Sequence, residues 1–371
     1  LHFLVFFGIV TSAYFLLAHK FRWVLLLIAS CYFYMIFKPE YILILGFTIL
    51  IDYYAGILIE NSQGAKRKAF LSLSLLANVG VLAVFKYYFF AGDIFVKFSH
   101  LLGGDLHWPT WEIVLPIGLS FHTFQAMSYT IEVYRGNQKA ERHFGIYSLY
   151  VMFYPQLVAG PIERPQNLIH QFYEKHTFDK ARIHSGILQM LQGLFKKVVI
   201  ADRLAQFVDF TYSDISNQSS FSLLLASIFY SFQIYCDFSG YSDIAIGASK
   251  VMGFDLMKNF NAPYLAKSLP DFWRRWHKSL GSWLRDYLYI PLGGNRSGGI
   301  GTYIASTIIF VFLIFITQWY ELVYVYFGLM ALYFLCWHFF PKFKHYLNRD
   351  LNLLITMVVG GLWHGASENF V

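Results

Sequence analysis

Charged residues are scarce in this chain. Only 14% of its 371 residues are Asp, Glu, Lys or Arg, whereas soluble domains carry about 25%. Apolar residues make up 57% and aromatic residues 20%. This composition argues against a soluble globular domain and predicts an all-α polytopic membrane protein.

Cysteine and contiguous basic surface are also scarce. Cys31, Cys236 and Cys336 are single residues inside apolar segments, so they offer neither a disulfide framework nor the spacing of a metal site. The formal net charge is +7, but the basic residues are scattered through short loops, which argues against a nucleic-acid groove. We find no internal repeat, low-complexity tract or soluble domain boundary, and therefore expect a single membrane domain over residues 1–371.

Long apolar runs dominate the chain. A helix needs about 20 residues to cross a bilayer, and most of eight runs approach that length. Three shorter runs are below that length and are expected to enter the membrane without crossing it. The long runs are 1–17, 23–37, 41–58, 70–88, 113–131, 221–238, 302–320 and 322–340, and the short ones are 146–159, 187–200 and 351–362.

Basic residues set the expected orientation. The loops 18–22, 59–69 and 132–145 hold eight Lys and Arg, against two in the intervening loops 38–40 and 89–112. The positive-inside rule then places the N-terminus outside and the loop 59–69 in the cytoplasm. The first run lacks the basic n-region of a signal peptide and residue 1 is Leu, so we expect this run to be a true span and the natural start to precede it.

The run 146–159 is flanked on both sides by basic residues, which favours a re-entrant hairpin that returns to the cytoplasmic side. Pro155 and the pair Gly160-Pro161 break the helix where such a segment turns. Exposed backbone at that depth is tolerated only beside protein or a water-filled cavity, so we expect a cavity here. Glu163 and Arg164 follow as a turn with an ion pair.

Residues 259–296 are charged and aromatic, with no run long enough to span. Ser268, with Pro270 and Asp271 after it, predicts a helix start. An aromatic face then recurs at spacings of three or four, opposite a basic face, and the segment 291–294 ends the helix. The pattern predicts one interfacial helix along the membrane surface. The aromatic face is Phe272, Trp276, Leu280, Trp283 and Tyr287.

Two of the thirteen histidines stand out. His364 ends the apolar stretch 353–365 and has Gly361 and Gly365 near it, which allow a close approach. His277 lies in the segment Asp271-Phe-Trp-Arg-Arg-Trp-His277. Burial favours the neutral imidazole that a general base needs, and ionisable groups at membrane depth usually face a cavity or a partner. The alternative for His364 is a structural hydrogen bond between helices, and for His277 a contact with lipid phosphate.

A third polar cluster, residues 232–243, holds Gln233, Asp237 and Asp243 at the end of a span. Paired acids can bind a metal or move protons, but this spacing matches no ligand signature. We therefore favour a hydrogen-bonded break in the helix.

Taken together, the motifs at 153–162, 231–243, 271–277, 283–296 and 361–366 resemble the membrane-bound O-acyltransferase family, in particular the branch that O-acetylates bacterial polysaccharides. The resemblance covers residues 1 to about 300 and resumes near residue 352. It implies an all-α ring of tilted transmembrane and re-entrant helices around a central tunnel. There an acyl thioester from the cytoplasm meets an acceptor hydroxyl on the outer side.

The resemblance also implies a site. His364 matches the family's essential histidine and His277 matches its second frequently implicated histidine. The residues expected to line the tunnel lie in or near the same motifs. It implies a bacterial cytoplasmic membrane, a thioester donor such as acetyl coenzyme A or an acyl carrier protein, and a surface polysaccharide or extracytoplasmic partner as acceptor. We expect no metal and no tightly bound cofactor. The expected lining residues are Asp271, Trp273, Arg274, Trp276, Gln233, Asp237 and Trp363.

This chain departs from the family pattern at residues 295–352, where two apolar runs predict an extra helix pair at 301–340. An even number of crossings leaves His364 on the expected side. The chain stops at Val371, where the family pattern continues with further spans, so we expect the C-terminal end to be incomplete. Two other classes stay open, a transporter or flippase and a non-catalytic anchor for a polysaccharide-modifying complex.

Overall fold

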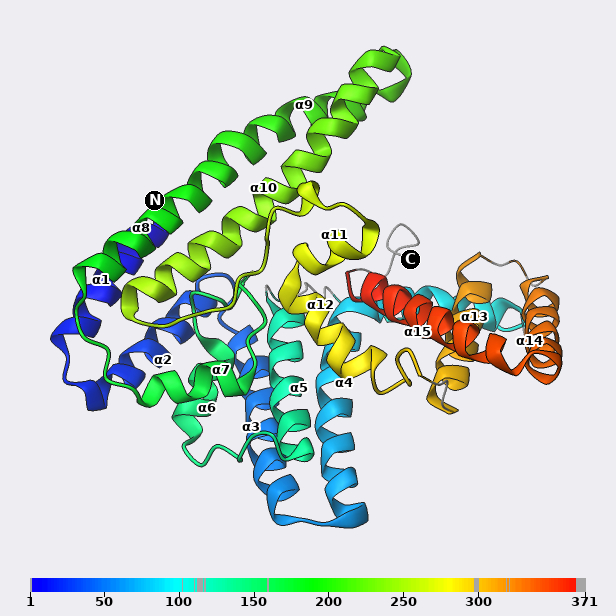
Figure 1. Ribbon diagram of the computed structural model, residues 1–371, viewed down its shortest axis with the longest axis horizontal. Coiled ribbons are helices and arrows are strands. Elements are labelled where there is room, and N and C mark those ends of the chain that lie inside the picture. Colours follow the sequence, from blue (N-terminus) through cyan, green and yellow to red (C-terminus); the bar gives the residue numbers. More distant parts are fainter. Residues whose placement is uncertain are drawn as a thin grey trace. The chain divides into compact units, whose positions relative to one another are not determined.

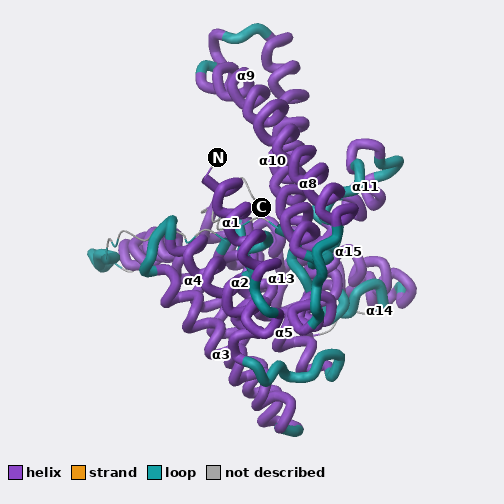
Figure 2. The backbone as a smooth tube through the Cα atoms, turned by 90° about the vertical axis from the view of Figure 1, so that its left-hand side faces the viewer, coloured by secondary structure: helices purple, strands orange, loops and turns teal. Residues whose placement is uncertain are grey.

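In its described part, the computed structural model has helices joined by turns and loops (Figure 1). It describes residues 2–101, 103–109, 111, 116, 118–158, 160–296, 300–317, 319 and 321–364, and these ranges contain no strand (Figure 2). The residues cluster into two compact units. The first combines residues 1–81 and 116–280, and the second combines 82–115 and 281–371. The prediction of a single domain is not tested by this grouping.

The first unit holds most of the helices. Helix α4 begins there and continues into the second unit, and α12 lies across the boundary in sequence. The elements are α1 (His2–Leu16), α2 (His19–Met35), α3 (Tyr41–Asn61), α4 (Gly64–Leu101), α5 (Leu119–Arg135), α6 (Phe144–Met152), α7 (Pro165–Leu168), η1 (Ile169–Tyr173), α8 (Lys180–Leu194), η2 (Phe195–Ala201), α9 (Asp202–Ser213), η3 (Ile215–Asn217), α10 (Ser220–Met252), η4 (Pro263–Leu265), α11 (Leu269–Arg275) and α12 (Lys278–Leu284).

Three helical stretches in the described residues are long and apolar enough to cross a bilayer. They are Tyr41–Asn61, Gly64–Asp93 and Ser220–Met252. The other runs expected to span form helices of 15 to 18 residues, and their crossing stays a prediction. The run 187–200 does not form a short dip. It lies within helical structure that continues from residue 180 to residue 213 through α8, η2 and α9.

The segment predicted to be re-entrant forms the core of the first unit. Helix α6 is buried at every position from 145 to 152, against α2 and α3, and the chain turns at 154–158. Phe153 and Tyr154 are almost fully buried. Tyr150 Oη donates to the carbonyls of Gln125 (3.2 Å) and Glu163 (2.9 Å), which ties the broken backbone to α5. The predicted helix break is confirmed, and the backbone at the break is buried against other parts of the protein.

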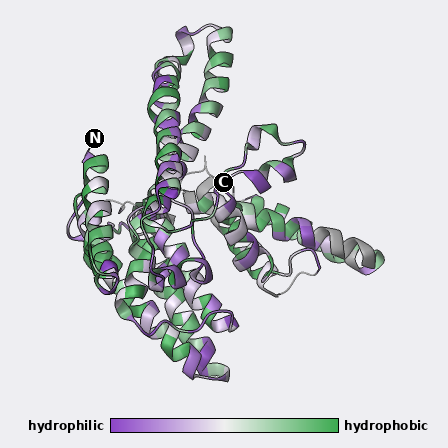
Figure 3. Ribbon diagram, turned by 60° about the vertical axis from the view of Figure 1, so that its left-hand side comes forward, coloured by the Kyte–Doolittle hydropathy of each residue, from purple (hydrophilic) through white to green (hydrophobic). Residues whose placement is uncertain are grey.

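Helices α8 and α10 pack at glycines, side by side in Figure 1. A Cβ atom on Gly193 would lie 2.5 Å from the carbonyl oxygen of Gly240, and one on Gly186 would lie 2.8 Å from that of Gly247. Only glycine permits this close backbone approach, which is typical of helix pairs in membranes. Many apolar side chains of the two helices are exposed instead, among them Ile187, Leu191, Leu224 and Ile228. Hydrophobic residues recur along most helices of the chain (Figure 3).

Helices α3, α4 and α5 meet at a buried polar cluster. The Asp52 carboxylate accepts hydrogen bonds from Ser74 Oγ (2.6 Å) and from Asn78 Nδ2 (2.9 and 2.8 Å), and Ser74 Oγ also contacts Thr130 Oγ1 (3.1 Å). All four residues are at most 1% exposed. This network fixes the register of the three helices in surroundings where a lost hydrogen bond is costly.

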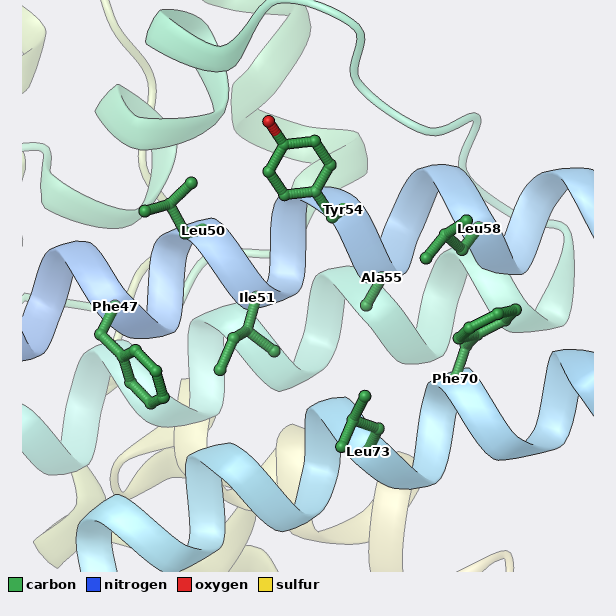
Figure 4. A pocket seen from close by; sticks show the side chains of 8 residues that line it. All are labelled: Phe47, Leu50, Ile51, Tyr54, Ala55, Leu58, Phe70 and Leu73. Atoms are coloured by element: carbon green, nitrogen blue, oxygen red, sulfur yellow. The ribbon is translucent and has the colours of Figure 1, made fainter.

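An apolar groove runs between α3 and the first half of α4 (Figure 4). Its volume is about 350 Å³ and its eight lining side chains are hydrocarbon apart from one tyrosine hydroxyl. Such a surface suits lipid tails. The lining residues are Phe47, Leu50, Ile51, Tyr54, Ala55, Leu58, Phe70 and Leu73.

The second unit contains the end of α4, η5 (Arg285–Tyr289), α13 (Ile300–Thr317), α14 (Leu322–Phe339) and α15 (Pro341–His364). Thr302 Oγ1 donates to Asn352 Oδ1 (2.8 Å), and Tyr333 Oη donates to Asn348 Oδ1 (2.6 Å), so polar pairs join α13 and α14 to α15. The two apolar runs at 302–320 and 322–340 are helical over residues 302–317 and 322–339. The apolar run 351–362 is part of a longer helix.

Candidate functional site

His277 lies at a sharp break between α11 and α12. Its backbone φ is 41°, in the left-handed region that side chains other than glycine rarely adopt. The single interfacial helix predicted over residues 268–290 is therefore wrong. It is divided here because Lys278 N donates to the Asn259 carbonyl (2.8 Å) and Asn261 N donates to the Arg275 carbonyl (2.9 Å). These bonds replace helical ones. The predicted start at Ser268 is confirmed, since its Oγ accepts from Asp271 N (3.3 Å).

The side chain of Asn259 holds the His277 ring. Its Oδ1 accepts from Ser279 N (3.2 Å) and Ser279 Oγ (2.9 Å), and lies 3.1 Å from His277 Nδ1. A backbone N–H can only donate, so the atom facing Ser279 N must be the amide oxygen. His277 Nδ1 therefore carries a proton. In the neutral ring Nε2 then has the lone pair that a base or a hydrogen-bond acceptor needs.

Aromatic rings enclose this imidazole, which is 4% exposed. Phe238 of α10 lies edge-on to it at 4.6 Å between ring centroids, and Phe121 of α5 and Phe260 lie nearly parallel to it at 6.2 Å. These rings come from α5, from α10 and from the loop that precedes η4, so the surroundings of the imidazole are built from segments far apart in sequence. In such apolar surroundings a hydrogen bond is stronger than in water, which favours the contact with Asn259.

The other residues predicted in the segment 271–276 make contacts of their own, and Trp276 shares Phe260 as a neighbour with His277. Asp271 pairs with Arg275 Nε (3.0 Å) and accepts from Lys267 N (3.2 Å), and the hydrogen bond from Arg275 lowers the pKa of the Asp271 carboxyl. Trp273 is 47% exposed and Arg274 is also exposed. Trp276 stacks on Phe272 and meets Phe260 edge-on. Whether these residues line a tunnel stays a prediction.

Helix α10 runs without interruption through the acidic cluster, so the predicted break at 232–243 is wrong. Asp237 pairs with Lys197 Nζ (2.5 Å), and Asp243 pairs with Lys196 Nζ (2.6 Å). The acids are thus neutralised by consecutive lysines of η2, which allows the helix to continue. Gln233 is half-buried, and its Oε1 has no hydrogen-bond partner in the described part of the chain.

Trp363 and His364 end α15 in the second unit. Trp363 is 8% exposed, and its carbonyl accepts a hydrogen bond from Lys86 Nζ. The backbone of His364 forms the last residue of the helix, but its side chain and residues 365–371 lie outside the described residues. The catalytic assignments of His364 and His277 stay predictions.

The cavity expected beside the segment predicted to be re-entrant is present. It has a volume of about 510 Å³ within the first unit. Tyr154, Pro155, Val158 and Gly160 line one side, and residues of α1, α2, α8, η2 and α10 line the rest. Among the described lining residues, Lys197 is the only charged one. The cavity is therefore largely hydrophobic rather than a polar passage, and His277 does not line it.

Asn259 and Ser279 contact His277 directly, and neither was predicted from the sequence. Neither residue belongs to a periodic pattern, and 18 positions separate Asn259 from the histidine. Only the polar segment around Asn259, between apolar runs, was a usable signal. Among the residues that the structure describes, no three His, Cys, Asp or Glu side chains gather as metal ligands, and the expectation that the protein needs no metal stays a prediction.

Comparison with known proteins adds a family. The model of the membrane-bound O-acyltransferase family matches residues 143–343, a range that includes Asn259, His277 and Ser279. The predicted extra pair 301–340 lies inside this match, and its status as an addition stays a prediction.

Curated relatives agree with the match. The chain is 35% identical over 371 residues to the probable alginate O-acetylase AlgI of Pseudomonas aeruginosa, covering 99% of this chain and 61% of the relative. It is 36% identical to a peptidoglycan O-acetyltransferase of Helicobacter pylori (93% and 61%) and 28% identical to a teichoic acid D-alanyltransferase of Bacillus subtilis (64% and 62%). The chain thus spans about three fifths of the length of these relatives.

Proposed function

The chain belongs to the membrane-bound O-acyltransferase family, and we propose that it moves an acetyl group from a thioester toward a hydroxyl of a cell-surface polysaccharide. The observation that carries the proposal is the similarity to an alginate O-acetylase over 99% of the chain. The names of the relatives share one reaction type, transfer of an acyl group to a polymer of the cell surface, although the acyl group is acetyl in some and D-alanyl in another.

The proposed mechanism uses His364 as general base. The acceptor hydroxyl oxygen attacks the thioester carbonyl while the imidazole takes its proton. The new C–O bond forms, the C–S bond breaks, and the imidazolium returns the proton to the leaving thiolate. A positioned base contributes about 10² to 10⁴ in rate, and alignment of donor and acceptor can contribute more.

His277 has a distinct role in this proposal. Because Asn259 fixes its Nδ1 proton, Nε2 faces the opposite side of the ring as an acceptor. Because the ring is 4% exposed, the surrounding aromatic side chains have to move in this proposal before Nε2 orients a hydroxyl or a donor N–H at the entry. The exposed guanidinium of Arg274 attracts an anionic donor such as a coenzyme A or phosphopantetheine thioester. Arg275 is occupied by Asp271 and contributes less.

The location and partners follow the same proposal. The protein would lie in the bacterial cytoplasmic membrane, take its thioester from the cytoplasm, and deliver the acyl group outside to a polymer or to an extracytoplasmic partner that completes the transfer. It needs no tightly bound cofactor, because the thioester itself supplies the activated acyl group.

The decisive experiment compares His364→Ala with His338→Ala in cells that lack the native protein. His338 is an exposed histidine of α14 and controls for loss of any histidine. The O-acetyl content of surface polymer is measured by mass spectrometry, and protein level by immunoblot. We expect His364→Ala to abolish acetylation at normal protein level and His338→Ala to leave it unchanged. Normal acetylation in His364→Ala would refute catalysis and leave an anchor or conduit role.

A further inference from the structure

Lys86 is an ionisable residue at an unexpected place. It lies in the stretch Gly64–Asp93 of α4, which is apolar enough to cross a membrane, and its neighbours on both sides are apolar or aromatic. No ion pair joins it to an acid in the described part of the chain. Such residues are costly in a membrane and usually serve a specific contact. The proposed chemistry of the protein leaves Lys86 without a role.

The contacts of Lys86 all lead to the end of α15. Its Nζ donates to the carbonyl oxygen of Trp363 and lies 5.5 Å from the centroid of the Trp363 ring. The next residue, Tyr87, donates its hydroxyl proton to the carbonyl oxygen of Leu362. Both sides of these contacts belong to the second unit. Two consecutive residues of one helix thus hold two consecutive carbonyls of another.

Helix physics explains why this contact is favourable. The last four carbonyl groups of a helix have no partner within it, and they carry a partial negative charge. Leu362 and Trp363 lie in the last turn of α15, which ends at His364. An ammonium and a hydroxyl placed there satisfy two of these carbonyls and complement the dipole. Two fixed carbonyls in sequence also fix the rotation of that turn about the helix axis.

We propose that Lys86 and Tyr87 are positioning residues that hold the backbone on which His364 is carried. The proposal rests on the proposed function, in which His364 is the base. Lys86 and Tyr87 do not touch the reacting atoms in this scheme. They keep the last turn of α15 in one place and orientation, so that the imidazole meets the acceptor hydroxyl at the correct distance.

The kinetic test uses the full-length protein in lipid nanodiscs with acetyl coenzyme A as probe donor and a soluble oligosaccharide acceptor. The variants are Lys86→Met, Tyr87→Phe and the double variant, with Lys86→Arg as the conservative rescue. The matched control is Tyr88→Phe, because the hydroxyl of Tyr88 donates to a different carbonyl, that of Pro109 (2.7 Å). We expect kcat of the double variant to fall by about 10- to 100-fold, with the donor KM changed less than about twofold.

Lys86→Arg, which keeps a cationic donor, should retain more activity than Lys86→Met, and Tyr88→Phe should resemble the wild type. A kcat in the double variant equal to that of Tyr88→Phe overturns the proposal. Where the double variant does not fold, Tyr87→Phe alone decides, because it removes only one oxygen atom.

A second measurement does not depend on activity. Diethyl pyrocarbonate modifies exposed imidazoles, and mass spectrometry gives the rate at His364 itself. Loss of both donors should loosen the last turn and raise that rate, whereas Tyr88→Phe should not. An unchanged rate overturns the positioning role even if His364 is catalytic. A raised modification rate supports the positioning role. It does so even if His364→Ala retains full activity, because full activity of that variant would refute only the proposed function.

Discussion

Replacing Asn259 with Ala should destabilise the protein more than any exposed change nearby. The amide oxygen of Asn259 serves three donors, Ser279 N, Ser279 Oγ and His277 Nδ1, and the side chain is 1% exposed. Each buried donor left without a partner costs about 1–3 kcal/mol. Because a water molecule can partly fill the space, we expect a total loss of about 2–5 kcal/mol in the free energy of unfolding.

The assay is reversible unfolding in mixed detergent micelles, followed by tryptophan fluorescence. Asn261→Ala is the matched control, since the Asn261 side chain is exposed and, among the described residues, the bond that Asn261 makes is from its backbone N–H to the Arg275 carbonyl. The control should change stability by less than about 0.5 kcal/mol. Equal stability of the two variants would refute the role of the Asn259 amide in holding His277, and with it the assigned Nδ1 proton.

Two further predictions concern pH and helix packing. Burial raises the pKa of Glu163 from 4.5 to about 7, so between these pH values the folded state keeps a proton that the unfolded state has released. Stability should therefore fall as pH rises from 4.5 to 7, by up to about 3 kcal/mol, and Glu163→Gln should flatten that slope in the same unfolding assay. Gly193→Ala should cost about 1–3 kcal/mol, because its Cβ would lie 2.5 Å from the Gly240 carbonyl oxygen. Gly80→Ala, with no atom within 4 Å of the new Cβ, should instead stabilise α4 by about 0.5–1 kcal/mol, and equal effects at the two glycines would contradict the close packing of α8 and α10.

The sequence predicted the positions of the helices well and their continuity poorly. Apolar runs located α3, α4 and α10, and Pro155 with Gly160 located the end of α6, because hydrocarbon length and proline geometry act locally. A continuous helix was predicted where the chain breaks at His277, and a break was predicted where α10 is continuous at Asp237. Both predictions were wrong. Each depends on a distant partner, the loop at Asn259 in the first case and Lys197 in the second.

The two candidate catalytic residues show the same division. Both histidines were singled out from sequence, since an imidazole beside apolar residues is chemically unusual wherever it occurs. The groups that contact His277, and those that contact the turn of α15 carrying His364, were not. Asn259 and Ser279 at His277, and Lys86 and Tyr87 at the last turn of α15, have no pattern that links them to the histidines along the chain.

The chain by itself thus determined that this is a helical membrane protein of the O-acyltransferase family, because composition, run length and motif wording are properties of the sequence alone. Tertiary structure decided which nitrogen of His277 carries a proton, which cations neutralise the acids of α10, and what holds the end of α15. These properties depend on hydrogen bonds and ion pairs between segments far apart in sequence, and such contacts exist only once the helices have packed.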